Sequence, residues 1–358
     1  MDKFIQKLDF DLVTTQEVLM LIGLIDRYKG KWNAIEKEEN RYLIEMRRRS
    51  HIEGTGSSLR LDGYSITNSE IQNLLSSGGN TFPKSSGQQN AKGYYEALEL
   101  IQNQYTRIEL SGSYIKKLHQ LIFKYNTKDN DKTGGYRPDS SIVSAKKYPE
   151  GRQRSVIVTA NSDSVSGEMN ELLEWTNSQL RTAKVHPLIV IASFIYEFLI
   201  IHPFEMGNGV LSRLLTTLCF LKNDYGFILY VSLEKMYEEY KKSYNEVLIS
   251  GERNREKVNE RFDQWLLFFL KGIRDIIEKL EHGYVALKSR GRYLNGRQKE
   301  IKDFIAKNQP VKISDITKEL PTIRRSTLKK DLQYLRAEQV LTMIGKGKGS
   351  IYILKDNH

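Results

Sequence analysis

The middle of the chain holds an apolar run, residues 188–201, that narrows the choice of folds more than any other segment. The run has 14 residues and contains Glu197, whereas a membrane span needs about 20 apolar residues, so we expect no membrane span. It predicts an apolar helix that ends at His202, after which a Gly-Asn-Gly turn opens a second helix. Apolar side chains at helical spacing mark the buried face of that second helix: Leu211, Leu214, Leu215, Leu218 and Cys219.

The chain as a whole is too long for a single core. Its 358 residues predict two or three domains, and 39% apolar with 28% charged residues argues against wholesale disorder. Helical periodicity dominates, so the fold class is mainly α. We expect a helical amino-terminal segment at 1–90, a central domain at 91–285 and a small carboxy-terminal domain at 291–358.

The carboxy-terminal domain differs from the rest in charge and in pattern. The net charge of the chain is +11, and residues 291–358 carry 15 Lys or Arg against 7 Asp or Glu. Three helices are expected, the second capped by Ser314 and the third by Ser326, and then two β runs at 341–344 and 351–354. This order is that of a winged helix-turn-helix domain.

Four basic residues, Arg324, Arg325, Lys329 and Lys330, bracket the start of the third helix of this domain. In a winged helix this is the recognition helix, and basic side chains there suit phosphate and groove contacts. DNA is therefore one expected partner. Winged helices also dock proteins, and that alternative stays open.

The turn after the apolar run carries the chemistry of the central domain. Glycines at 207 and 209 let backbone amides approach a phosphate at the start of a helix, where the helix dipole favours an anion. Arg213, about one turn further on, can offer a planar cationic fork to the same anion. His202 is placed as a general base. A capped turn with a structural histidine is the alternative.

The whole string H-P-F-E-M-G-N-G-V-L-S-R at 202–213 resembles the signature of the Fic family, H-P-F-x-[D/E]-G-N-G-R-x-x-R. Gly135-Tyr136-Arg137 ahead of a β pattern at 142–159 resembles the family's flap, and Tyr244 with Trp265 to Leu270 resembles its closing helices. The resemblance covers roughly residues 1–285. It implies a Fic-type helical bundle with a β-hairpin flap.

That resemblance also implies an activity. Most Fic proteins transfer AMP from ATP to a Ser, Thr or Tyr hydroxyl of a target protein, with Mg²⁺ on the phosphates. His202 would accept the hydroxyl proton, and the nucleotide would be held by Gly207, Asn208, Gly209, Arg213 and Tyr244. Glycine at 209, instead of the lysine of the phosphotransferase branch, favours AMP as the transferred group.

Two positions depart from the signature. Met206 stands where the family has its acidic Mg²⁺ ligand, and a thioether is a poor ligand for a hard cation. Val210 replaces the first arginine and removes a phosphate contact. Glu205 is a candidate substitute ligand, so the metal ligands stay unknown. The alternative function is a catalytically degenerate Fic scaffold that acts as a nucleotide- or DNA-binding regulator.

An inhibitory element is readable before residue 90. The segment Ser58 to Gly63 resembles the family's inhibitory helix, [S/T]-x-x-x-E-[G/N], with Asp62 at the glutamate position. The resemblance implies that Asp62 pairs with Arg213 and blocks the seat of the γ-phosphate. Some family members with an amino-terminal inhibitory helix also remove AMP, and that activity stays open. The competing segment 50–54 lacks a hydroxyl four residues before Glu53.

The remaining features bound the setting of the protein. A single cysteine makes neither an internal disulfide nor a cysteine-based zinc site. The amino terminus shows no secretory pattern, so a cytoplasmic location is expected. Histidines at 51 and 119 show no metal-ligand spacing, and His186 before a proline starts a helix. The oligomeric state, including a homodimer, stays open.

Overall fold

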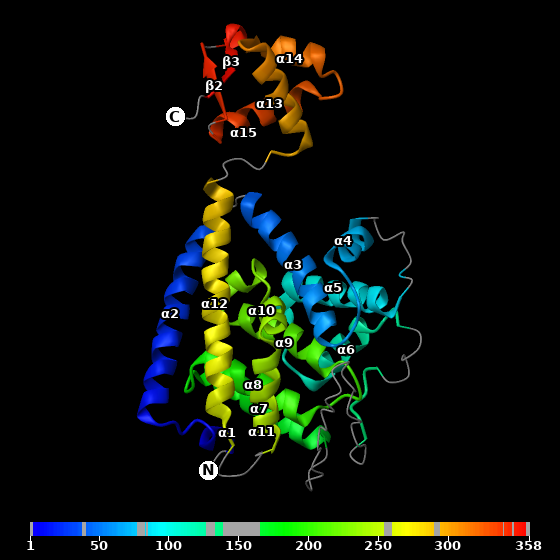
Figure 1. Ribbon diagram of the computed structural model, residues 1–358, viewed down its shortest axis with the longest axis vertical. Helices are drawn as coiled ribbons and strands as arrows, with labels where there is room; N and C mark the ends of the chain where they lie inside the picture. The colour runs from blue at the N-terminus through cyan, green and yellow to red at the C-terminus, as the bar shows by residue number, and fades with distance from the viewer. Residues whose placement is uncertain are drawn as a thin grey trace. The chain divides into compact units, whose positions relative to one another are not determined.

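The computed structural model describes most of the chain, namely residues 3–37, 41–76, 83, 85–126, 133–138, 165–253, 260–289, 294–338, 340–345 and 347–355. Fifteen α-helices and one small sheet in these residues confirm the mainly α fold (Figure 1). The β pattern expected for the flap, at 142–159, lies outside the described residues. Contacts divide the chain into two compact units, Met1–Leu280 and Glu281–His358. No helix in the described segments has the length and apolar character of a membrane span.

The first unit is built almost entirely of helices. Its elements are α1 (Lys3–Gln6), α2 (Leu12–Glu36), α3 (Arg41–Leu61), α4 (Asn68–Ser76), α5 (Ser86–Gln104), η1 (Tyr105–Arg107), α6 (Gly112–Ile122), α7 (Val165–Thr182), α8 (Pro187–Ile201), α9 (Asn208–Lys222), η3 (Gly226–Leu229), α10 (Leu233–Glu239), α11 (Lys241–Arg253) and α12 (Phe262–Ser289). The long helices α2 and α12 run side by side, and Lys271 forms an ion pair with Glu17 at 2.7 Å (Figure 1).

Helix α8 is the apolar run, and it lies in the core of the first unit. Almost all of its residues are buried, and it packs against α7, α9 and α11. The Trp265 indole N–H donates to the Ala192 carbonyl at 2.9 Å, which fixes α12 on α8. His186 caps the amino end of α8, so the helix start expected there is confirmed. A helix that is apolar on all sides has to be covered by other elements, so the apolar run predicted a buried helix.

Helix α3 packs against α4, α5, α9 and α10 and ends at Leu61. Its last turn closes through backbone bonds from Asp62 and Tyr64 to the Leu59 carbonyl, at 3.1 and 3.0 Å. Gly63 follows in the left-handed region, with φ 88°. Such a glycine is the usual end of a helix, and it leaves Asp62 as the first residue beyond the helix.

The second unit holds α13 (Gly296–Asn308), β1 (Val311–Lys312), α14 (Ile313–Glu319), α15 (Arg325–Ala337), β2 (Leu341–Ile344), η4 (Gly347–Gly349) and β3 (Ile351–Leu354). Its core gathers apolar side chains of all three helices with Val311, Val340 and Leu341. The sheet is antiparallel in the order β1-β3-β2, with Ile344 opposite Ile351 and Val311 opposite Tyr352. The three helices and the two longer strands were predicted; β1 was not.

Both helix caps expected in this unit are wrong. The N-cap residue of α14 is Lys312, the last residue of β1. Its N–H donates to the Asp315 carboxylate at 2.8 Å. Ser314 therefore lies inside the helix. Helix α15 is entered at Arg324 without a side-chain cap, and Ser326 lies within its first turn.

Candidate functional site

The turn between α8 and α9 has two residues in the left-handed region. His202 ends α8 with φ 51°, and its N–H donates to the Phe198 carbonyl at 3.1 Å. Gly207 opens α9 with φ 72°, and a Cβ added there would lie 2.5 Å from the Phe123 ring. Both the backbone conformation and the close ring therefore require glycine at 207.

Asn208 fixes the shape of this turn with its side chain. The carboxamide oxygen accepts from the Phe204 N–H at 3.0 Å, and the carboxamide nitrogen donates to the Phe204 carbonyl at 2.7 Å. The residue is 2% exposed. These two bonds make the Asn208 side chain a brace of the turn. Its predicted part in nucleotide binding stays a prediction, and it would fall to the backbone N–H.

His119 of α6 supports the same turn, a role that the sequence reasoning missed. Its ring stacks on Phe204, with centroids 4.1 Å apart and planes 9° apart. Nδ1 accepts from the Gly134 N–H at 3.0 Å, so the proton lies on Nε2, which donates to the Met206 carbonyl at 2.9 Å. Burial lowers the pKa of His119 to about 4, against the opposing effect of the Met206 bond. The ring is neutral at physiological pH.

Arg137 holds the carboxy end of α8. Its Nε donates to the His202 carbonyl at 2.9 Å, its Nη2 to the Ile201 carbonyl at 3.2 Å, and its backbone N–H to the Pro203 carbonyl at 2.8 Å. The side chain is 4% exposed. A cation at the carboxy end of a helix is favourable because the last carbonyls have no partner within the helix. Arg137 therefore positions the backbone of His202.

The expected partners Asp62 and Arg213 are brought together. Arg213 Nη2 donates to Asp62 Oδ1 at 2.8 Å and to the Ser58 carbonyl at 2.8 Å, while Nε donates to Ser58 Oγ at 2.8 Å. The side chain of Arg213 is 2% exposed and that of Asp62 is 17% exposed. Burial lowers the pKa of Arg213, but the Asp62 carboxylate together with Tyr244 and Tyr94 raises it by more, so the pKa is raised overall.

The Asp62 carboxylate also lies against the first turn of α9. A Cβ added at Gly209 would lie 2.9 Å from Asp62 Oδ1 and 3.2 Å from Arg213 Nη1. An anion near the first N–H groups of a helix is stabilised by those groups and by the helix dipole. A carboxylate of this chain therefore lies next to the first turn of α9, where an anion is favoured. The inhibitory role of Asp62 stays a prediction.

Tyr244 of α11 lies in an aromatic cluster. It is 6% exposed, and its ring lies 4.9 Å from that of Tyr237 and 6.1 Å from that of Trp265. The structure therefore accounts for Tyr244 as a core residue near Arg213. A contact with the nucleoside stays a prediction.

The residues around 206 do not fit a magnesium ion held at that position. Met206 offers a thioether, and its carbonyl is bonded to His119. The Glu205 side chain is exposed, and Val210 is fully buried. Within the described segments, no group of three or more His, Cys, Asp or Glu side chains is arranged to hold a metal ion. Glu205 as a ligand stays a prediction.

The four basic residues predicted to bind nucleic acid lie at the start of α15. Arg324, Arg325, Lys329 and Lys330 are all exposed. Asp331, which follows them, points inward and is 3% exposed. There it accepts from Arg297 at 2.6 and 3.2 Å and from Gln298 at 2.9 Å. This internal pairing leaves the outer face of the first turns of α15 strongly basic.

Comparison with known proteins adds the family and the fold. Residues 109–220 match the Fic/DOC family. A Fic family protein from Desulfovibrio desulfuricans G20 has a similar fold, with a TM-score of 0.65 and 18% identity over 96% of this chain and 97% of that chain. A Fic domain containing signaling protein from Bacteroides thetaiotaomicron has a TM-score of 0.59 and 22% identity, over 74% of this chain and 97% of that chain. A Fic-1 fragment from C. elegans has a TM-score of 0.56 and 18% identity, over 76% of this chain and 73% of that chain. At these identities the likeness to solved structures concerns the fold.

Proposed function

Residues 109–220 make this chain a Fic family protein, and we propose that it is a protein adenylyltransferase that its own Asp62 restrains. The family is known for AMP transfer and related transfers to protein targets. The observation that carries the proposal is the Asp62 carboxylate, bonded to Arg213 and lying against Gly209. An anion site at the start of α9 suits phosphates, and the carboxylate competes with them for the same donors.

The transfer uses residues of this chain in three roles. The His202 imidazole accepts the proton of the target hydroxyl while the hydroxyl oxygen attacks the α-phosphorus of ATP, and the bond to the bridging oxygen breaks to release pyrophosphate. The amides at the start of α9 and the Arg213 guanidinium stabilise the charge on the phosphates. Arg137 and His119 keep the turn in shape. No step is assigned to a metal held by Met206.

Labelling from ATP that carries its label in the α-phosphate tests the proposal. The full chain is incubated with labelled ATP and either Mg²⁺ or Mn²⁺, alone and with cell lysate, and label on protein is measured. We expect Asp62→Gly to raise labelling at least about fivefold, and His202→Ala to abolish it. Labelling that is unchanged by His202→Ala would refute the assignment of the base.

The alternative, a degenerate scaffold acting as a nucleotide- or DNA-binding regulator, is favoured by Met206 and by the basic face of α15. It predicts that ATP binds without labelling of any protein, in the wild type and in Asp62→Gly. Labelling that appears only in Met206→Asp would mark an enzyme that has lost its activity.

DNA binding is measured separately, on the full chain. The order of three helices and a small sheet in the second unit supports a winged helix. We expect duplex DNA to bind with a steep salt dependence, and the double substitution Lys329→Gln with Lys330→Gln to lower that salt slope by about 2. Lys318→Gln on α14, also exposed, is the matched control. Binding that is absent or insensitive to salt would favour protein docking.

A further inference from the structure

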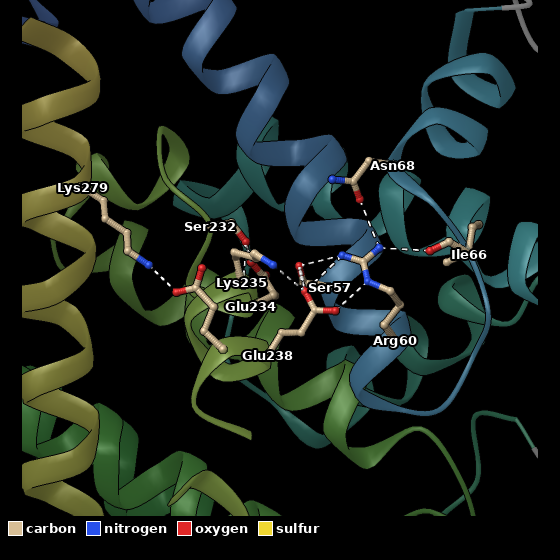
Figure 2. Close-up of polar contacts among 10 residues, drawn as sticks. Ser57, Arg60, Ile66, Asn68, Ser232, Glu234, Lys235, Glu238 and Lys279 are labelled. Carbon is tan, nitrogen blue, oxygen red and sulfur yellow. Dashed lines mark hydrogen bonds and ion pairs between the residues drawn. The ribbon is translucent and has the colours of Figure 1, made fainter. Parts of the chain in front are cut away.

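Arg60 lies two residues before Asp62, and its guanidinium donates hydrogen bonds to α10 and to the segment that follows α3 (Figure 2). Its Nε donates to Glu238 Oε1 at 2.6 Å, and its Nη2 donates to Glu238 Oε2 and to Ser57 Oγ, both at 3.1 Å. Its Nη1 donates to the Ile66 carbonyl at 3.0 Å and to Asn68 Oδ1 at 3.1 Å. All five N–H donors of the side chain are thus used. Arg60 ties the end of α3 both to α10 and to the segment that follows α3.

Glu238 of α10 is the matching acceptor. Besides the two bonds from Arg60, its Oε2 accepts from Ser57 Oγ at 2.9 Å and from Lys235 Nζ at 3.2 Å. The hydrogen bonds from Arg60 lower the pKa of Glu238 most, and those from Ser57 and Lys235 add to this effect. Burial acts in the opposite direction, and the pKa of Glu238 is about 2. We call Ser57, Arg60 and Glu238 the α3–α10 clamp. A fork-to-fork contact of this kind fixes orientation as well as distance.

The clamp and the contact with Arg213 use two sides of the same helical turn. Ser57 and Arg60, three residues apart, face Glu238. Ser58 and Asp62, four residues apart, both bind Arg213. Residues at these spacings lie on one face of a helix, so the turn offers one face to α10 and another to α9. A shift of the turn away from α10 therefore also moves Asp62 relative to Arg213.

We propose that the Arg60–Glu238 pair is a positioning device that holds Asp62 on Arg213 and so sets the affinity of the protein for ATP. This inference rests on the proposed function, because it assigns a cause to the restraint exerted by Asp62. The hydrogen bonds of Arg60 and Glu238 join α3, α10 and residues 66–68, whereas those of Arg213 join α9 to Ser58 and Asp62. Their side chains are 27% and 22% exposed, so the pair lies at the edge of the unit.

Glu238→Gln tests the device, and Glu239→Gln is its matched control. Glu239 is the next residue of α10, is exposed, and pairs with Lys279 of α12 away from the clamp. ATP and ADP are titrated into each full-length variant by calorimetry. We expect Glu238→Gln to tighten ATP binding at least about threefold and Asp62→Gly at least about fivefold. ADP, which lacks the γ-phosphate that competes with Asp62, changes little, and Glu239→Gln matches the wild type.

The double variant, Asp62→Gly with Glu238→Gln, decides whether the clamp acts through Asp62. It is expected to bind ATP as Asp62→Gly does, with no further gain. A gain for Asp62→Gly without any for Glu238→Gln overturns the positioning role and leaves the proposed function standing. No gain for Asp62→Gly overturns both. Equal gains for ATP and ADP also overturn the positioning role.

Arg60→Lys approaches the same contact from the other side and serves if Glu238→Gln does not fold. Lysine keeps the charge but cannot make a bidentate contact with a carboxylate or replace five donors. We expect the same selective gain for ATP over ADP. Unfolding midpoints of all variants, followed by circular dichroism, show whether each one is folded at the temperature of the titration. An Arg60→Lys variant that is folded and binds ATP as the wild type does would refute the device.

Discussion

Replacing Arg137 by methionine tests whether the carboxy end of α8 depends on this one side chain. Methionine reaches about as far as the arginine Nε, so it keeps an apolar stem and removes the charged fork. The carbonyls of Ile201 and His202 then lose their donors, at 3.2 and 2.9 Å. The backbone bond from residue 137 to Pro203 is kept. The substitution therefore isolates the guanidinium.

The cost follows mainly from the two bonds to the end of α8, since the third bond of the guanidinium, from Nη1 to the Pro138 carbonyl, is long at 3.5 Å. A hydrogen bond to a charged group contributes about 1.5–3 kcal/mol, and the longer bond belongs at the low end of that range. Part of the favourable interaction with the helix dipole, up to about 2 kcal/mol where partly buried, overlaps with these bonds and is not added in full. The longer bond at about 1.5 kcal/mol and the shorter one at about 1.5–3 kcal/mol give an expected fall in the free energy of unfolding of about 3–4.5 kcal/mol. Arg137→Lys, which keeps the charge but has a different reach, should lose about half of that.

Urea unfolding followed by tryptophan fluorescence measures this cost. All three tryptophans, Trp32, Trp175 and Trp265, belong to the first unit, so the signal reports on it alone. We also expect AMP transfer by the folded Arg137→Met variant to fall at least about tenfold, because small displacements of a catalytic group are costly. A loss of stability below about 0.5 kcal/mol, which is typical of an indifferent surface site, would refute the reasoning.

Three further predictions concern His119, Gly207 and Glu238. Burial lowers the pKa of His119 to about 4 in the folded protein, against the opposing effect of the Met206 bond. In the unfolded chain the pKa of a histidine is about 6.5, so as the pH falls below that value His119 is protonated in the unfolded chain before it is in the folded one. Between pH 7 and 5 this group should cost about 2 kcal/mol of stability, and His119→Gln should reduce the pH slope of urea unfolding; an unchanged slope would contradict it. Gly207→Ala, with its Cβ 2.5 Å from Phe123 and a φ of 72°, should lower the free energy of unfolding by at least about 2 kcal/mol, whereas Gly135→Ala, in open space, serves as its control. Since Arg60 holds the pKa of Glu238 near 2, the stabilisation by Glu238 is complete above about pH 4.5 and is lost as the pH falls toward 2; Glu238→Gln should flatten the acid limb of the urea-derived stability profile.

The sequence predicted the elements whose physics is local. The apolar run at 188–201 and the glycine turn after His202 give the two central helices, because burial on all sides and a left-handed helix end each leave a clear mark in the sequence. The contact between Asp62 and Arg213 was expected only through the family resemblance. No spacing rule joins residues 151 positions apart.

Other parts of the site could not be predicted because their partners are distant in sequence. Helix α3 contains Gly54 and Gly56, which weaken a helix by propensity, yet a Cβ at Gly54 would lie 2.8 Å from Glu234 Oε2. The close approach of α10 outweighs the propensity. Arg137 and His119 likewise act through carbonyls of the turn that begins at His202. His119 lies on the buried side of α6, and nothing in the sequence indicates what it binds.

The two departures from the family signature, Met206 and Val210, differ in how they contribute to the structure. Met206 is half-buried and contributes its carbonyl to His119, so its side chain is not what keeps the turn in place. Val210 is fully buried. A guanidinium at this position would lose its hydration, which is costly unless the surrounding core offers hydrogen-bond acceptors to its N–H groups. The loss at 206 thus concerns chemistry, whereas the change at 210 is built into the packing of α9. Restoring a carboxylate at 206 is accordingly the smaller step back toward the family's site, and a single arginine at 210 would disturb the helix that carries Arg213.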